Sequence, residues 1–277
     1  MAVAQLAQKF RIDGPAAEVG QAVQRLMEEP LSGVVRVLGS LPAAAANQRA
    51  ASFCAVVNPL RSKYPFNPTS GVDATLQDVA AVFHQESGAL AGLKNALGGV
   101  LIQQGTRFLP VPGGAIRPTS AFLDFFNRAA GTSSALWQAG PNEPRFSFSL
   151  KPRVDEAMPV VTVFVDGQVY QFTRTQLAAR PFDWIGARAR EVRVTAQIRG
   201  REEVLLQYGG TWAVFKLFNQ ATWRNTAPMQ LAGMPYILQW PIGQQGVTLE
   251  MELNLGQAPP FLRKDYFAGM NCVSRVQ

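Results

Sequence analysis

The chain has 277 residues, of which 47% are hydrophobic and 16% are charged, so it contains enough apolar material for one large core or two smaller ones. Its net charge of +7 is spread along the sequence without a long basic run, a pattern typical of a solvated surface rather than of a nucleic-acid footprint. No apolar stretch is long enough for a membrane-spanning helix, and residues 1–11 lack the apolar core of a signal peptide. These features leave two expectations, a cytosolic protein or a piece of a longer chain.

The first half of the sequence has the period of amphipathic helices. Apolar residues recur every three or four positions in the segments that we predict to be helical, which are residues 16–29, 43–60, 76–83, 90–101 and 121–130. We expect Pro30 to end the first helix and Pro42 to open the second. We expect Asp73 to cap the third helix, and Thr119 or Ser120 to cap the last.

The period changes near residues 139–144 from helical to alternating. The alternation predicts strands at residues 145–150, 160–165, 169–172, 191–199, 203–208, 236–240 and 247–255. Asp166-Gly167 favours a two-residue hairpin turn, and one helix is expected at residues 212–223. The C-terminal residues read as irregular.

Helices followed by strands indicate an α+β chain rather than a parallel α/β sheet. We therefore predict two domains. The first is an α-helical subdomain, a helical bundle over residues 1–140. The second is an antiparallel β-sandwich-like domain over residues 141–277, with one inserted helix.

Candidate catalytic residues are few. His84 is the single histidine, and no Gly-x-Ser-x-Gly nucleophile motif accompanies it. Glu250 and Glu252 share one strand face, so a hydrolase with paired carboxylates is one alternative, although a solvated strand face explains the same spacing. The sequence shows no glycine-rich phosphate loop and no metal-ligand cluster. We expect no cofactor, no metal and no enzymatic activity.

The two cysteines, Cys54 and Cys272, are too few for a zinc site of their own. In a reducing compartment they would be two small buried residues. In an oxidising compartment they could form a disulfide between the two halves of the chain. The sequence leaves both interpretations open.

Aromatic and basic residues of the second half are candidates for recognition. Most of Trp184, Trp212, Trp223 and Trp240 should be core residues, but exposed ones would make a carbohydrate- or peptidoglycan-binding module, which is the alternative function. Several arginines are expected to cluster around one hairpin, where they would meet an acidic partner or protect an exposed strand edge. They are Arg188, Arg190, Arg193, Arg199 and Arg201.

Several short strings resemble segments of the IcmF/TssM family of type VI secretion membrane subunits, in the order in which that family has them. They are Cys54 with Tyr64-Pro65-Phe66, AFLDFFNRA at 121–129, Asp166-Gly167-Gln168 with Phe182-Asp183-Trp184, and GTWAVFKLF at 210–218. The resemblance covers most of the chain from about residue 40 and corresponds to the C-terminal periplasmic region of these proteins.

The resemblance implies a non-catalytic periplasmic scaffold, attached to the inner membrane only through a missing N-terminal part. The implied partners are the outer-membrane lipoprotein TssJ, which the β domain docks, the inner-membrane subunit TssL, and further copies of the same subunit. No nucleic acid is expected. The large side chains of the similar segments are expected to be structural anchors, and they are Tyr64, Phe66, Trp184, Trp212, Phe215 and Phe218.

Overall fold

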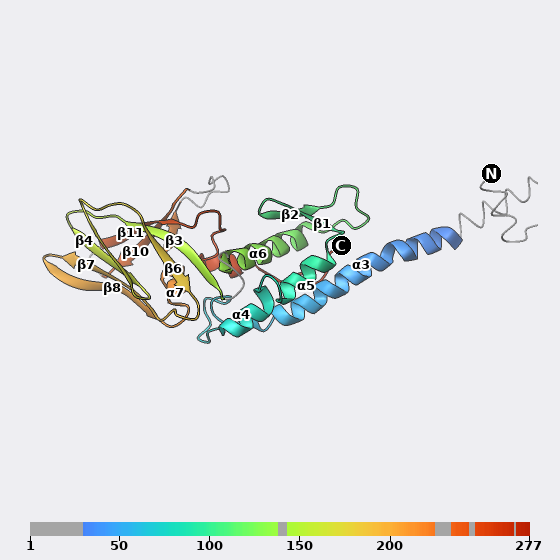
Figure 1. Ribbon diagram of the computed structural model, residues 1–277, viewed down its shortest axis with the longest axis horizontal. Helices are drawn as coiled ribbons and strands as arrows, with labels where there is room; N and C mark the ends of the chain where they lie inside the picture. The colour runs from blue at the N-terminus through green and yellow to red at the C-terminus, as the bar shows by residue number, and fades with distance from the viewer. Residues whose placement is uncertain (1–29, 138–142, 225–233, 244–246, 269) are drawn as a thin grey trace, which may run out of the picture.

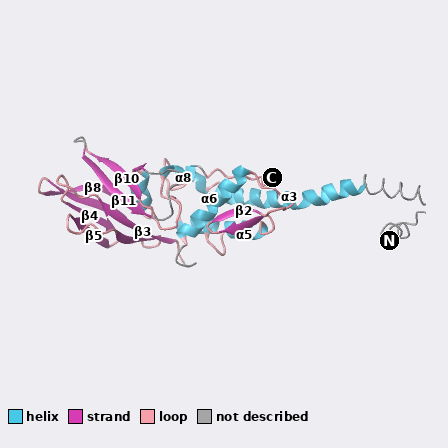
Figure 2. Cartoon of the chain, turned by 90° about the horizontal axis from the view of Figure 1, so that it is seen from above, coloured by secondary structure: helices cyan, strands magenta, loops and turns pink. Residues whose placement is uncertain are grey.

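The computed structural model describes residues 30–137, 143–224, 234–243, 247–268 and 270–277. The molecule is elongated, with helices at one end and two β-sheets at the other (Figures 1 and 2). The helix predicted at residues 16–29 lies outside the described residues. Within them, no helix is both long and apolar enough to cross a membrane.

The helical body is formed by the first half of the chain. Its elements are α3 (Pro30–Val57), the 3₁₀ turn η1 (Leu60–Ser62), α4 (Leu76–Phe83), α5 (Ala89–Ala96), the hairpin strands β1 (Leu101–Gln104) and β2 (Arg107–Pro110), and α6 (Ser120–Leu136). An apolar stripe of α3 is buried at Ala46, Ala50, Phe53 and Val57, as the helical period predicts.

Proline and capping residues act differently from the prediction at two helix starts. Pro42 does not open a helix, because α3 begins at Pro30 and runs through residue 42. Asp73 does not cap α4. Thr75 is the N-cap, and its side chain forms a reciprocal capping box with Asp78.

The two later helices differ in length from the prediction. The helix predicted over residues 90–101 ends at Ala96, and Leu101 begins β1 instead, because the glycines at 98 and 99 separate the two elements. The helix predicted to end at residue 130 continues to Leu136. Its last turns bury Ser133, whose hydroxyl donates to the Phe83 carbonyl oxygen at 2.6 Å.

The two-sheet body, residues 145–255, contains two antiparallel sheets. The strands are β3 (Arg145–Pro152), β4 (Val160–Val165), β5 (Gln168–Thr173), β6 (Arg180–Ile185), β7 (Glu191–Ile198), β8 (Arg201–Gly209), β9 (Thr222–Arg224), β10 (Tyr236–Ile242) and β11 (Val247–Asn254). One sheet has the order β6-β3-β11-β10-β9 and the other β5-β4-β7-β8. Alternate residues are buried along β3, β4 and β11, so each of these strands presents one face to the core.

The α+β prediction is confirmed, whereas the inserted helix is shorter than predicted. Helix α7 covers only Ala213–Asn219, and Trp223 lies on the short strand β9. The side-chain amide of Asn219 donates to the carbonyl oxygens of Phe215 and Leu262 where the helix ends. The segment after residue 255 includes α8 (Lys264–Ala268) and returns to the helical body, so the predicted boundary at residue 140 stays a prediction.

Candidate protein-docking site

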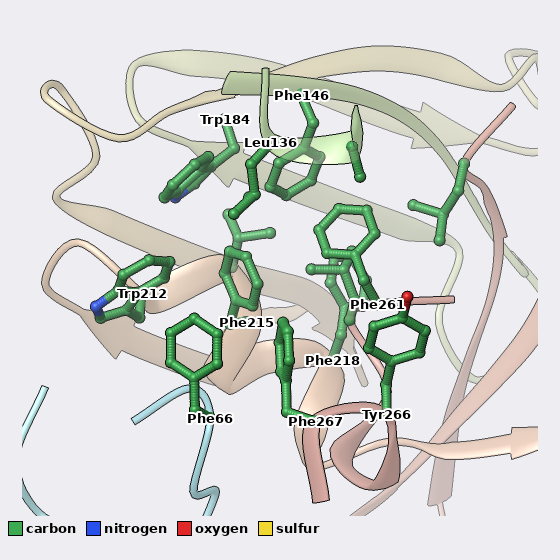
Figure 3. Close-up of a cluster of buried hydrophobic side chains, with 14 of the residues drawn as sticks. Phe66, Leu136, Phe146, Trp184, Trp212, Phe215, Phe218, Phe261, Tyr266 and Phe267 are labelled. Carbon is green, nitrogen blue, oxygen red and sulfur yellow. The ribbon is translucent and has the colours of Figure 1, made fainter. Parts of the chain in front are cut away.

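One cluster of large side chains joins the two bodies, and we call it the junction cluster (Figure 3). Its members come from the helical body, the start of β3, the end of β6, α7 and the C-terminal segment. They are Phe66, Leu136, Phe146, Trp184, Trp212, Phe215, Phe218, Phe261, Tyr266 and Phe267. None is more than 8% exposed. Because apolar contact is continuous from the helices to the sheets, the two bodies share one core.

Ring contacts show how closely this cluster is packed. The Phe66 and Phe267 ring centroids are 4.7 Å apart, which joins the helical body to the C-terminal segment. The Trp184 and Trp212 rings stack at 5.5 Å. Phe215 lies 5.0 Å from Trp212 in an edge-on arrangement. Such aromatic pairs add stabilisation beyond the area they bury.

Polar contacts fix the same junction. The indole N–H of Trp212 donates to the Ala74 carbonyl oxygen at 2.8 Å, across the two bodies. The Lys216 ammonium on α7 pairs with Asp73 at 3.1 Å and lies 5.5 Å from the centre of the Tyr64 ring. Burial, and then the nearby Asp73 charge, raise the pKa of Tyr64 well above its ordinary value. The phenol therefore stays neutral within the junction.

The structure places every predicted anchor in the interior. Trp184, Trp212, Phe215 and Phe218 are at most 1% exposed, and Tyr64 and Phe66 are each 5% exposed. All but Tyr64 belong to the junction cluster. Tyr64 instead contacts Lys216, one of the polar residues beside the cluster. Sequence reasoning missed Phe261, Tyr266 and Phe267, because the C-terminal residues read as irregular. The signal available was the density of aromatic residues in that segment.

The end of the two-sheet body away from the junction carries loops, and we call it the loop end. Its described connections include those at residues 153–159, 174–179 and 199–200. β3 starts beside α6, at a bridge between Trp137 and Arg145, and runs away from it. The pairing of the other strands with β3 and with one another therefore puts these connections at the far end (Figure 1).

These three connections of the loop end carry mixed charge and one exposed large apolar side chain. Glu156 and Arg174 on neighbouring loops form an exposed ion pair at 3.4 Å. Leu177 is 38% exposed. Arg199 and Gly200 have positive φ angles of 52° and 78°, as the tight turn between β7 and β8 requires. Short loops on a two-sheet body are a usual place for binding residues.

The predicted arginine cluster is wrong. Arg188 and Arg190 precede β7, whereas Arg199 and Arg201 follow it, and a strand of eight residues separates the pairs by about 25 Å. Arg193, in the middle of β7, lies 5.5 Å from the centre of the Phe164 ring. These residues form no single patch, because sequence proximity on a hairpin does not place opposite strand ends together.

One strand edge is closed by a side chain. The Gln168 amide donates to the Asp183 carbonyl oxygen at 2.8 Å, and its carbonyl oxygen accepts from the Asp183 N–H at 2.9 Å. Gln168 belongs to β5 and Asp183 to the edge strand β6 of the other sheet. The amide thus occupies backbone groups that a further strand would need. This closure is a second feature that sequence reasoning missed.

The candidate catalytic residues have structural partners. Glu252 pairs with Lys151 at 3.0 Å, and Glu250 accepts from the Gln239 amide at 2.7 Å, both on the non-core face of the sheet. His84 caps the end of α4, and its ring lies 5.7 Å from Trp137. Across the described residues, no group of three or more His, Cys, Asp or Glu side chains could hold a metal ion.

The tryptophans do not form an exposed platform. Trp184, Trp212 and Trp240 are at most 1% exposed. Trp223 is half-buried, and its indole N–H donates to the Phe218 carbonyl oxygen at 3.0 Å. The feature on which the carbohydrate-binding alternative depended, an exposed pair of these residues, is therefore not observed.

The two cysteines form a disulfide. Cys54 lies near the end of α3 and Cys272 in the C-terminal segment, with their Cα atoms 5.6 Å apart. The bond joins residues that are 218 positions apart in the sequence. Both partners lie at the helical body, because the C-terminal segment has returned there.

Comparisons with known proteins agree with this arrangement. The structure is similar to the T6SS protein TssM C-terminal domain (869–1107) from EAEC, with a TM-score of 0.64 and 22% identity over 83% of this chain and 97% of that chain. It is also similar to a chain of a type VI secretion system membrane core complex, with a TM-score of 0.64 and 20% identity over 93% of this chain and 51% of that one. A chain of a type VI membrane complex is similar as well, with a TM-score of 0.58 and 20% identity over 80% of this chain and 44% of that one.

The chain thus spans about half the length of the chains that it matches in the two complexes. Comparison of the sequence with curated proteins gives no match. Residues 148–255, most of the two-sheet body, match the family described as the type VI secretion protein IcmF C2-like domain. This part of the chain is therefore similar to an IcmF C2-like domain, and the likeness to the C-terminal region of TssM that the sequence motifs predicted is confirmed.

Proposed function

We propose that this chain is a non-catalytic periplasmic scaffold of a type VI secretion membrane complex, and that its loop end docks the outer-membrane lipoprotein TssJ. The observation that carries the proposal is the shared core. The junction cluster fixes the helical body to the two-sheet body, so the loops at 153–159, 174–179 and 199–200 project from one stiff unit. A stiff support lowers the entropy cost of binding a partner.

The helical body lies at the opposite end and is the part closer to the N-terminus (Figure 1). In this arrangement it faces the inner membrane, where a TssL-like subunit and further copies of the same subunit are its neighbours. Attachment to the membrane comes through an N-terminal part of the full-length subunit. The likeness to chains of two membrane complexes supports a place in such a complex.

A binding titration with purified TssJ tests the proposal. Leu177 is the exposed large apolar side chain of these loops, and an aspartate in its place would bury an unpaired carboxylate in the interface, which is costly. We expect Leu177→Asp to weaken TssJ binding at least about tenfold, which is about 1.4 kcal/mol. The matched control is Val72→Asp, because Val72 is 62% exposed but lies on a loop of the helical body.

The control should bind TssJ like the unchanged chain. Circular dichroism and thermal unfolding establish that both variants are folded. Absence of TssJ binding by the folded, unchanged chain would reject the docking function. Equal affinities of the two variants, or a larger loss for Val72→Asp, would reject the loop end as the place of docking.

A further inference from the structure

The C-terminal residues 270–277 form a strap across the helical body. The Val276 N–H donates to the Asn47 side-chain oxygen on α3 at 2.7 Å. The Val276 carbonyl oxygen accepts from the N–H of Thr119, the N-cap residue of α6, at 2.8 Å. Arg61 donates to the Asn271 side chain at 2.7 Å. The strap thus connects α3, η1 and the start of α6.

Few noncovalent contacts hold this segment. Met270 and Val276 are the side chains of the strap that are fully buried, at 1% and 0% exposed. The remaining residues are exposed or half-buried, and of these Cys272 and Val273 pack against the core. Ordering an eight-residue segment without regular secondary structure costs backbone entropy at every position. The contacts described above are few compared with that cost.

The disulfide supplies the covalent part of the attachment. Cys54 and Cys272 are the only two cysteines of the chain, and both are in the disulfide. Cys54 is 7% exposed, whereas Cys272 is half-buried. Cys272 is therefore the more accessible partner of the disulfide, and access is one of the factors that set the rate of thiol–disulfide exchange.

We propose that the Cys54–Cys272 disulfide is a redox-controlled latch. When oxidised, it holds the strap on α3 and on the N-terminal end of α6. When reduced, it releases the strap and uncovers the surface that Val276 occupies, while the two-sheet body stays folded because its core lies in its own strands and the junction cluster. The inference does not depend on binding of any lipoprotein.

The reductant is a dithiol. One of its thiolates attacks the Cys272 sulfur, the bond between the two cysteine sulfurs breaks, and Cys54 leaves as a thiolate that takes up a proton. The second thiol of the reductant then attacks the mixed disulfide and releases Cys272. Two electrons pass to the cysteine pair, which ends as two thiols, and the dithiol ends as its own disulfide.

Hydrogen–deuterium exchange of the purified chain, with and without dithiothreitol, tests the latch. We expect reduction to speed exchange of the Val276 and Thr119 amides at least about tenfold, because each donates a hydrogen bond that the docked strap maintains. Amides of β3, β4, β7 and β11 should keep their protection. Cys272→Ser should reproduce the reduced pattern without any reductant.

The double variant Cys54→Ser with Cys272→Ser is the control, and dithiothreitol should leave its exchange unchanged. Unchanged protection of Val276 and Thr119 in the reduced chain would overturn the proposal, because noncovalent contacts would then suffice. Loss of protection throughout the strands on reduction would overturn it as well, since the bond would be a staple of the whole fold.

Discussion

Replacing Phe215 by alanine removes the central ring of the junction cluster. Phe215 has no exposed surface, and its ring centroid lies 5.0 to 5.9 Å from those of Phe146, Trp184, Trp212 and Phe261. Truncating a buried phenylalanine costs about 3–5 kcal/mol. We expect a value of about 4 kcal/mol, because rigid rings on four sides cannot close the cavity. Urea unfolding followed by tryptophan fluorescence measures the change in the free energy of unfolding.

Phe164→Ala is the matched control for this experiment. Phe164 is half-buried on the non-core face of β4, beneath Arg193, so its removal should cost about 1 kcal/mol. A loss below about 1.5 kcal/mol for Phe215→Ala, or equal losses for the two variants, would refute the assignment of Phe215 as the centre of a shared core.

Three further predictions concern smaller features. Gln168→Ala should lower the free energy of unfolding in urea by about 2 kcal/mol, since it removes two hydrogen bonds to the β6 edge. Gln171→Ala, at an exposed position of the same strand, should lower it by less than about 0.5 kcal/mol. Equal losses would contradict closure of the edge by Gln168. A Cβ on Gly186 would lie 2.9 Å from a Leu76 methyl group, so Gly186→Ala should lower the free energy of unfolding by about 1–2 kcal/mol. Adding Leu76→Ala to the same chain should relieve part of this loss. Strictly additive losses for the two substitutions would exclude the contact. Burial raises the pKa of Tyr266 to about 12 from 10.0, so the folded state keeps a proton that the unfolded state loses. The contribution of the protonated Tyr266 phenol to the free energy of unfolding is therefore fully present below about pH 10, and it is lost as the pH rises towards 12. Between about pH 10 and 12 the free energy of unfolding should fall less steeply with pH for Tyr266→Phe than for the unchanged chain. Equal slopes for the two proteins would contradict this prediction.

Period and turn chemistry predicted most of the regular structure. The alternation at residues 145–150 and 160–165 corresponds to β3 and β4, and Asp166-Gly167 forms the expected hairpin. These features are local, because each strand buries one face and the dipeptide has the positive φ that the turn needs. The helix predicted at 76–83 likewise corresponds to α4.

The remaining features depend on contacts that are distant in the sequence. The strap docks through Asn47 and Thr119, and no local pattern near residue 276 indicates either partner. Ser133 is buried because it reaches the Phe83 carbonyl oxygen, so a polar residue interrupted the apolar period. Arg188 and Arg199 are close in sequence, yet the length of β7 separates them. Such features follow from topology rather than from residue type.

The docking claim is tested most directly by hydrogen–deuterium exchange of the oxidised chain with and without bound TssJ. The account predicts slower exchange on binding at residues 153–159, 174–179 and 199–200, and unchanged exchange over α3, α5 and the hairpin of β1 and β2. Protection confined to the helical body, with these loops unaffected, would contradict it.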